Sequence, residues 1–142
     1  MRAINFDMDG TIANFYGVEG WLDCLMASDA TPYKIAKPLI NMSVLARYLN
    51  RLQRKGYSIN IISWLSKSGT KEFNEEVTTA KLEWLKKHLP SVKWDKINIV
   101  PYGTPKQTLG NGILFDDEKP NRDNWVGTAY DVNNILGVLR TL

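Results

Sequence analysis

The chain has 142 residues, of which 44% are hydrophobic and 23% charged, and both its length and this balance are typical of one folded domain. They exclude disordered, collagen-like and fibrous chains. The net charge of +3 does not by itself indicate binding to nucleic acid or to a membrane. No apolar run approaches the roughly 18 residues of a membrane span, and the single cysteine, Cys24, favours a reducing compartment. We therefore expect a soluble, cytoplasmic protein with a single domain over residues 1–142.

The first half of the chain alternates apolar runs with a helical pattern. Residues 2–7 predict a short buried strand that ends in a tight loop. Residues 14–38 are irregular and rich in glycine and proline, so they are the candidate insertion. After Asn41, a plausible N-cap, the apolar residues of 42–55 have helical spacing. A second strand is expected at 57–63.

The second half continues the alternation. Residues 70–88 predict the longest helix, and strands are expected at 97–100, 113–115 and 126–129. A closing helix is expected at 133–142. Strands that alternate with helices predict an α/β fold, in which helices cover both faces of a parallel sheet.

Polar side chains follow three of the predicted strands. Asp7 and Asp9 come directly after the first strand, Ser63 closes the second, and Asp116 and Asp117 follow the fourth. Because ligands bind at the carboxyl ends of the strands in such sheets, we expect these side chains to meet in one crevice. Taken alone, Asp116 and Asp117 have a simpler interpretation as turn or cap residues.

Four carboxylates in one crevice would repel one another, and a bound divalent cation would relieve that repulsion. Oxygen ligands of this kind suit Mg²⁺, which keeps several waters and leaves positions open for a phosphate oxygen. Lys106 lies in the loop before the fourth strand and would add a second positive charge. This combination is typical of phosphoryl transfer.

The pattern Asp7-x-Asp9-Gly10-Thr11 is the most specific signal in the chain. At average residue usage it occurs by chance in roughly one chain of this length in a thousand. A calcium loop is excluded, because its sixth and twelfth positions would be Ile12 and Val18. The only histidine, His88, lies in the last turn of a predicted helix, where it complements the helix dipole. Histidine triads and histidine-bound zinc are therefore excluded.

These landmarks resemble the haloacid dehalogenase (HAD) superfamily of phosphohydrolases. Asp7-x-Asp9-Gly10-Thr11 resembles motif one, Ser63 motif two, Lys106 motif three, and the pair Asp116-Asp117 motif four. The resemblance runs from about Ala3 to Asp117. It implies a Rossmann-like (HAD-like) parallel sheet and a Mg²⁺-dependent phosphatase.

The resemblance also implies roles for individual residues. Asp7 would be the nucleophile that forms an aspartyl phosphate, and Asp9 the general acid and then the base. The residues expected at the metal are Asp7, Asp9 through its backbone carbonyl, Asp116, and Asp117 through water or a neighbour. The groups expected to bind the phosphoryl oxygens are Ser63, Lys106 and backbone amides from Met8 to Gly10.

Within the superfamily, two groups are similar to this chain. The run Phe6-Asp7-Met8-Asp9-Gly10, the pair Ile62-Ser63 and the short step from Lys106 to Asp116 resemble 5′(3′)-deoxyribonucleotidases. Residues 56–57 and 68–72 resemble the 3′-phosphatase module of polynucleotide kinases. The expected substrate is a (deoxy)nucleoside monophosphate. The alternatives are a polynucleotide 3′-phosphatase, another macromolecule-directed phosphatase and a noncatalytic binding module of the same fold.

The insertion at about 14–38 would serve as a minimal cap. It is shorter than the helical cap of deoxyribonucleotidases. Relatives with small caps accept larger substrates or borrow a lid from a partner subunit. A homo-oligomer is therefore one of the alternatives. Four aromatic residues near the motifs could stack on a base: Tyr16, Trp21, Tyr33 and Trp64. Alternatively, Trp21 and Tyr33 pack the insertion onto the sheet.

A cluster of basic residues bears on nucleic acid binding. Arg47, Arg51, Arg54 and Lys55 are close in sequence, but their positions in a predicted helix are typical of a solvated face. With the modest net charge, nucleic acid is the less favoured partner and a small phosphate ester the preferred one.

Overall fold

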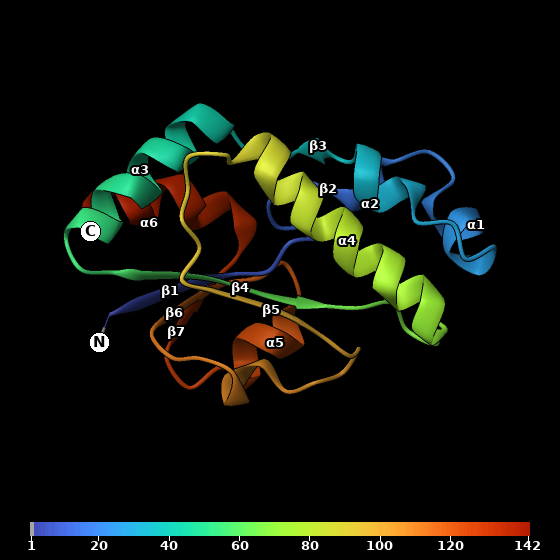
Figure 1. Ribbon diagram of the computed structural model, residues 1–142. Helices are drawn as coiled ribbons and strands as arrows, with labels where there is room; N and C mark the ends of the chain where they lie inside the picture. Colours follow the sequence, from blue (N-terminus) through green and yellow to red (C-terminus); the bar gives the residue numbers. More distant parts are fainter. Residues whose placement is uncertain (1) are drawn as a thin grey trace.

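The computed structural model describes residues 2–142 and is built around a five-stranded parallel sheet (Figure 1). The strands are β1 (Ala3–Phe6), β4 (Ser58–Trp64), β5 (Lys96–Val100), β6 (Ile113–Phe115) and β7 (Thr128–Tyr130). Their order is β5-β4-β1-β6-β7, with β1 at the centre. The chain leaves β1 towards β4 and β5 and later returns to β6 on the other side of β1. Such a switch in direction opens a crevice at the carboxyl ends of the central strands.

Helices cover both faces of the sheet, as the alternating pattern predicts. Figure 1 shows α3 (Met42–Arg54), α4 (Lys71–His88) and α6 (Ile135–Thr141) over one face, and α5 (Lys119–Asn124) on the other. Short 3₁₀ turns, η2 (Lys106–Thr108) and η3 (Val132–Asn134), precede β6 and α6. The protein is therefore an α/β fold of the Rossmann-like type. Within residues 2–142, no helix has both the length and the apolar character needed to cross a membrane.

The larger part of the core lies between the sheet and the helices α3, α4 and α6. It contains Phe6, Leu45, Leu49, Ile59, Leu85, Phe115, Ile135 and Leu139, all of them buried. A smaller cluster under α5 consists of Ile62, Leu114 and Trp125. The side chains of β1 are buried on both faces, as expected for the central strand of a parallel sheet.

The helix starts follow from capping side chains that the sequence shows. Asn41 Oδ1 accepts a hydrogen bond from the Val44 amide at 3.1 Å, and Thr70 Oγ1 accepts one from the Phe73 amide at 3.1 Å. Helix α5 is absent from the sequence-based prediction, because the segment Lys119–Asn124 is polar throughout and has no apolar stripe. Strand β7 begins two residues later than expected, and the side chain of Val126 is exposed.

The insertion folds into a small layer beside α4. It contains η1 (Phe15–Gly17), α1 (Trp21–Met26) and α2 (Thr31–Ile35), and the strands β2 (Ala13–Asn14) and β3 (Lys37–Pro38) pair antiparallel at its two ends. Three of its buried side chains, Phe15, Ala30 and Tyr33, pack with Phe73, Val77 and Ala80 of α4. The insertion is thus fixed against the longest helix, next to the carboxyl ends of the strands (Figure 1).

Candidate active site

A tight loop carries the first two aspartates out of β1. The Asp7 amide donates to the Phe115 carbonyl oxygen at 3.0 Å, which holds this loop beside β6. Gly10 turns the chain with a φ of +80°, a conformation that residues with a Cβ rarely adopt. A Cβ at this position would also collide with the carboxylate of Asp117. Glycine is therefore required both by the turn and by the close approach of Asp117.

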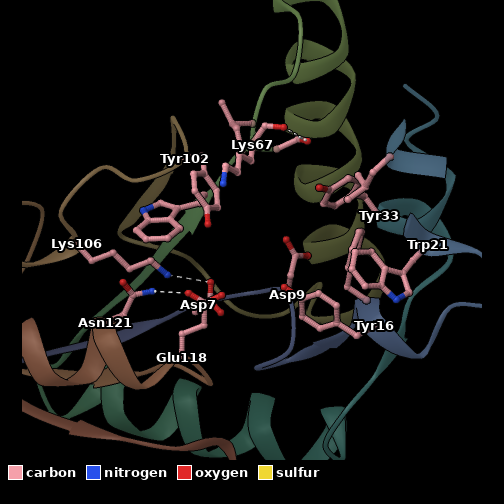
Figure 2. Close-up of a pocket in the computed structure, with 15 residues that line it drawn as sticks. Asp7, Asp9, Tyr16, Trp21, Tyr33, Lys67, Tyr102, Lys106, Glu118 and Asn121 are labelled. Carbon is pink, nitrogen blue, oxygen red and sulfur yellow. Dashed lines mark hydrogen bonds and ion pairs between the residues drawn. The ribbon is translucent and has the colours of Figure 1, made fainter. Parts of the chain in front are cut away.

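A buried lysine bridges two of the carboxylates at the floor of the site, and Figure 2 shows its contact with Asp7. Lys106 Nζ lies 3.0 Å from Asp7 Oδ1 and 2.7 Å from Asp116 Oδ2. Burial alone would lower the pKa of Lys106, but the charges of Asp7 and Asp116 raise it to about 12. Lys106 therefore stays cationic at any physiological pH.

Three carboxylates form a cluster that includes the two partners of this lysine. Oxygen atoms of Asp7, Asp116 and Asp117 all lie within 4.8 Å of one another. Burial and the charge of Asp7 raise the pKa of Asp116 to about 6 and that of Asp117 to about 8. One ammonium group cannot neutralise three carboxylates. The oxygen donors and the excess negative charge therefore fit a hard divalent cation.

The hydroxyl group of Thr11 lies between Asp7 and Asp117 of the carboxylate cluster. Its hydroxyl Oγ1 lies 2.9 Å from Asp7 Oδ2 and 3.2 Å from Asp117 Oδ1, and it accepts a hydrogen bond from the Asp117 amide at 3.2 Å. Asp116 is held by the Glu118 amide, which donates to its Oδ1 at 2.9 Å. These bonds orient the carboxylates before any ligand binds.

A second buried lysine lies beside Asp9, and the sequence-based prediction misses it. Lys81 Nζ of α4 lies 3.0 Å from Asp9 Oδ2, 2.7 Å from Ser63 Oγ and 2.6 Å from the Trp64 carbonyl oxygen. Burial raises the pKa of Asp9, although the charge of Lys81 opposes this effect. The signal in the sequence is that Lys81, four residues after Val77, falls within the apolar stripe of its helix.

The structure brings together every side chain that the four motifs predict, with one difference among the backbone groups. Ser63 is fully buried at the end of β4, and the side chain of Met8 is in the core. The Gly10 amide, expected to bind phosphate, donates instead to the Ala13 carbonyl oxygen at 2.8 Å. It is not a free donor, because the turn that needs glycine also uses this amide.

Aromatic rings form two walls of a cavity of about 330 Å³ above the aspartates (Figure 2). The insertion supplies Phe15, Tyr16, Trp21 and Tyr33, and the opposite wall has Trp64 and Tyr102. Tyr16 is 48% exposed and Tyr102 51%, whereas Tyr33 is 6% exposed. Tyr102 is absent from the predicted residues, although it follows the third predicted strand at the same edge of the sheet.

No protein-family model matches this chain, and no curated protein matches it at a significant level. Structure comparison finds a shared fold. The crystal structure of D,D-heptose 1,7-bisphosphate phosphatase from B. bronchiseptica, in complex with magnesium and phosphate, superposes with a TM-score of 0.56 at 11% sequence identity. The superposition covers 87% of this chain and 74% of the phosphatase. At this identity the likeness shows the fold alone.

Proposed function

We propose that this protein is a Mg²⁺-dependent phosphatase of the haloacid dehalogenase type, which hydrolyses phosphate monoesters through an aspartyl phosphate. The observation that carries the proposal is the buried Lys106, which bridges Asp7 and Asp116 beside Asp117 at the carboxyl ends of the strands. A phosphatase solved with magnesium and phosphate shares the fold. A buried cation among acidic oxygen donors is an arrangement suited to phosphoryl transfer.

Asp7 is the nucleophile in this proposal. Its carboxylate forms a bond to phosphorus while the bond from phosphorus to the leaving oxygen breaks. Thr11 and Lys106 hold its two oxygens at 2.9 and 3.0 Å and so limit its rotation. Lys106 also offsets negative charge on the phosphoryl oxygens in the transition state.

Asp9 is the acid and base. It protonates the leaving oxygen in the first step and then accepts a proton from the water that cleaves the aspartyl phosphate. Burial raises the pKa of Asp9, which favours the protonated form that the first step needs. Mg²⁺, held by Asp7, Asp116 and the Asp9 carbonyl with Asp117 beside it, would supply positive charge for the phosphoryl oxygens.

The substrate that we propose is a (deoxy)nucleoside monophosphate. The cavity is at the small end of the usual range for small-molecule sites, which is roughly 300–1,000 Å³. Tyr16 and Trp21 on one wall and Tyr102 on the other present aromatic surface to the space above Asp7. Rings in such positions can stack on a base, whichever base it is.

The basic cluster on α3 gives little support to a nucleic acid substrate. Arg51 donates to the Leu139 carbonyl oxygen at 2.9 Å, and Lys55 donates to the Leu142 carbonyl oxygen at 3.2 Å. These side chains tie α3 to the C-terminal segment near the start of β1 (Figure 1). The cavity opens at the other end of the strands, so this cluster forms no basic path into it.

The proposal is tested with a panel of phosphate esters. The panel contains nucleoside 5′- and 3′-monophosphates, sugar phosphates, p-nitrophenyl phosphate and 3′-phosphorylated oligonucleotides, assayed for phosphate release with Mg²⁺ and with EDTA. We expect hydrolysis of nucleoside monophosphates that stops with EDTA and returns with Mg²⁺. A preference for the oligonucleotides would show that the substrate is the end of a nucleic acid and not a mononucleotide. Release of no phosphate from any ester would refute the phosphatase and favour a noncatalytic binding module.

A further inference from the structure

The buried ammonium group of Lys81 contacts three oxygen atoms, and two of them belong to the proposed reaction. It donates hydrogen bonds to Ser63 and Trp64 and forms an ion pair with Asp9. Lys81 is 1% exposed, and its Nζ lies within 3.0 Å of Ser63 Oγ, the Trp64 carbonyl oxygen and Asp9 Oδ2. An ammonium group has three donors and no acceptor, so Lys81 can only donate to these oxygen atoms. A buried cation is costly unless it is paired in this way.

The first consequence concerns the hydroxyl group of Ser63. Because lysine can only donate, Ser63 Oγ must be the acceptor in their 2.7 Å contact. Over residues 2–142, no protein group accepts the hydroxyl hydrogen of Ser63 in return. That hydrogen is therefore available to an oxygen atom of a bound phosphoryl group.

The second consequence concerns the carboxyl group of Asp9. Lys81 holds Oδ2 at 3.0 Å, and in the described part of the chain no protein group donates to Oδ1. Figure 2 shows Asp9 standing in the cavity between Asp7 and the aromatic wall. One oxygen of Asp9 is thus anchored, and the other is left for the leaving group.

The insertion holds this lysine in place. The Tyr33 ring of α2 lies over Lys81 Nζ, 5.3 Å from the ring centre, and Tyr33 packs against Phe15 with ring centres 4.5 Å apart. A cation beside an aromatic face is stabilised electrostatically. The aromatic layer of the insertion therefore helps to bury the ammonium group of Lys81.

We infer that Lys81 is a positioning residue of the phosphatase, one that directs the Ser63 hydroxyl to the phosphoryl group and the Asp9 carboxyl to the leaving oxygen. The inference rests on the proposed function. It makes α4 a part of the site, whereas the four sequence motifs all lie at the ends of strands or in loops. The proton that Asp9 transfers remains its own, since Lys81 acts only by orienting Asp9.

The test compares Lys81→Met with wild type on two esters, p-nitrophenyl phosphate and an alkyl ester such as a nucleoside monophosphate. A good leaving group needs little protonation, so it depends little on Asp9. The ratio kcat/KM reports the steps up to release of the leaving group. We expect it to fall on the order of 100-fold for the alkyl ester, the lower end for a general acid, and much less for p-nitrophenyl phosphate. In Asp9→Asn protein, adding Lys81→Met should lower kcat/KM for the alkyl ester less than it does in wild type, because one of the two groups that Lys81 orients is already lost.

Lys87→Met serves as the matched control, because Lys87 is an exposed lysine on the same helix. It should leave both rates unchanged. Thermal unfolding shows whether each variant is folded, and if Lys81→Met is not, Lys81→Gln takes its place in the same comparison. A merely structural role predicts equal losses for the two esters and independent effects in the double variant, and that result would overturn the inference. Wild-type protein that hydrolyses neither ester would instead overturn the proposed function itself.

Discussion

The indole Nε1 of Trp84 donates a hydrogen bond to the carbonyl oxygen of Ala36 at 2.8 Å. Trp84 is buried in α4, and Ala36 ends the helical part of the insertion. This bond joins the longest helix to the segment that carries the aromatic wall of the cavity. The insertion is consequently anchored at its C-terminal end, in addition to the packing of Phe15 and Tyr33.

Trp84→Phe should lower the free energy of unfolding, because the Ala36 carbonyl oxygen loses its buried donor. The expected loss is about 1 kcal/mol, the usual contribution of one hydrogen bond, in addition to the smaller ring volume. Trp94→Phe is the control for volume, since Trp94 Nε1 has no hydrogen-bond partner within the described chain. Denaturant unfolding measures both variants, and equal losses would show that the Trp84 bond contributes nothing.

Asp7→Asn should abolish turnover and leave the fold intact. The amide is nearly isosteric but cannot form the aspartyl phosphate, so activity should fall below about 1% of wild type. Thermal stability without metal should be equal or higher, because the change removes one of three clustered carboxylates. Asp123→Asn, which only breaks an exposed ion pair with Lys119, should keep full activity. Substantial residual turnover in Asp7→Asn would exclude the covalent role.

Stability without metal should depend on pH in a defined direction. Burial and the Asp7 charge raise the pKa of Asp116 to about 6 and that of Asp117 to about 8, against about 3.9 in an unfolded chain. The folded protein thus holds these protons more tightly than the unfolded one. The stability that these two carboxyl groups contribute is therefore fully present below about pH 4. It is lost as the pH rises through 6 and 8.

A bound cation removes this loss, because it favours the charged carboxylates. We therefore expect the increase in Tm on adding Mg²⁺ to be larger at pH 8.5 than at pH 5.5. Thermal unfolding in EDTA and in Mg²⁺ at the two pH values measures the difference. In EDTA, Asp117→Asn should flatten the decline between pH 5.5 and 8.5. A Mg²⁺ effect that is equal at both pH values would contradict the proposed metal site.

Gly10→Ala should damage both stability and activity. At a φ of +80° a Cβ costs roughly 1–2 kcal/mol, and here it would also displace the Asp117 carboxylate. Gly20→Ala is the matched control, since Gly20 has a φ of +74° and a Cβ added there would meet no atom within 4 Å. Both variants should lose stability, but only Gly10→Ala should weaken Mg²⁺ binding by calorimetry. Equal Mg²⁺ affinity in the two variants would show that Asp117 does not contribute to Mg²⁺ binding.

The aromatic walls should divide into rings that bind substrate and rings that support the fold. Tyr16→Ala should raise KM for a nucleoside monophosphate, because a stacked ring contributes about 1–3 kcal/mol, and leave a small alkyl phosphate without any ring nearly unaffected. Tyr33→Ala should lower Tm and slow both substrates, since Tyr33 is buried against Phe15 and Lys81. Steady-state kinetics with both esters separates the two outcomes. If Tyr16→Ala treats both esters alike, the nucleotide preference loses its support from this wall.

Local patterns in the sequence are enough to predict most elements of this fold. The cap residues Asn41 and Thr70, the apolar runs of the strands and the stripe of α4 act over a few residues, so each can be recognised without its tertiary partners. The approach of Asp7 and Asp116 to one another can likewise be predicted from the sequence, because parallel strands bring the residues that follow them to one edge of the sheet. The polar helix α5 could not be predicted from the sequence, because it has no periodic apolar face.

Only the tertiary structure decides which charges meet. The sequence places Lys106 near the crevice, but only the structure shows that its ammonium group bridges Asp7 and Asp116. Lys81 falls within the apolar stripe of α4, and its contacts with Asp9 and Ser63 depend on how α4 packs beside β4. The roles of the aromatic rings also depend on the tertiary structure. Tyr16 is exposed and Tyr33 is buried, and the sequence alone does not show this difference. The sequence determined which groups could take part in chemistry, since their types and local conformations are local properties. Packing determined which of them are buried, paired and oriented, because these depend on contacts between distant segments.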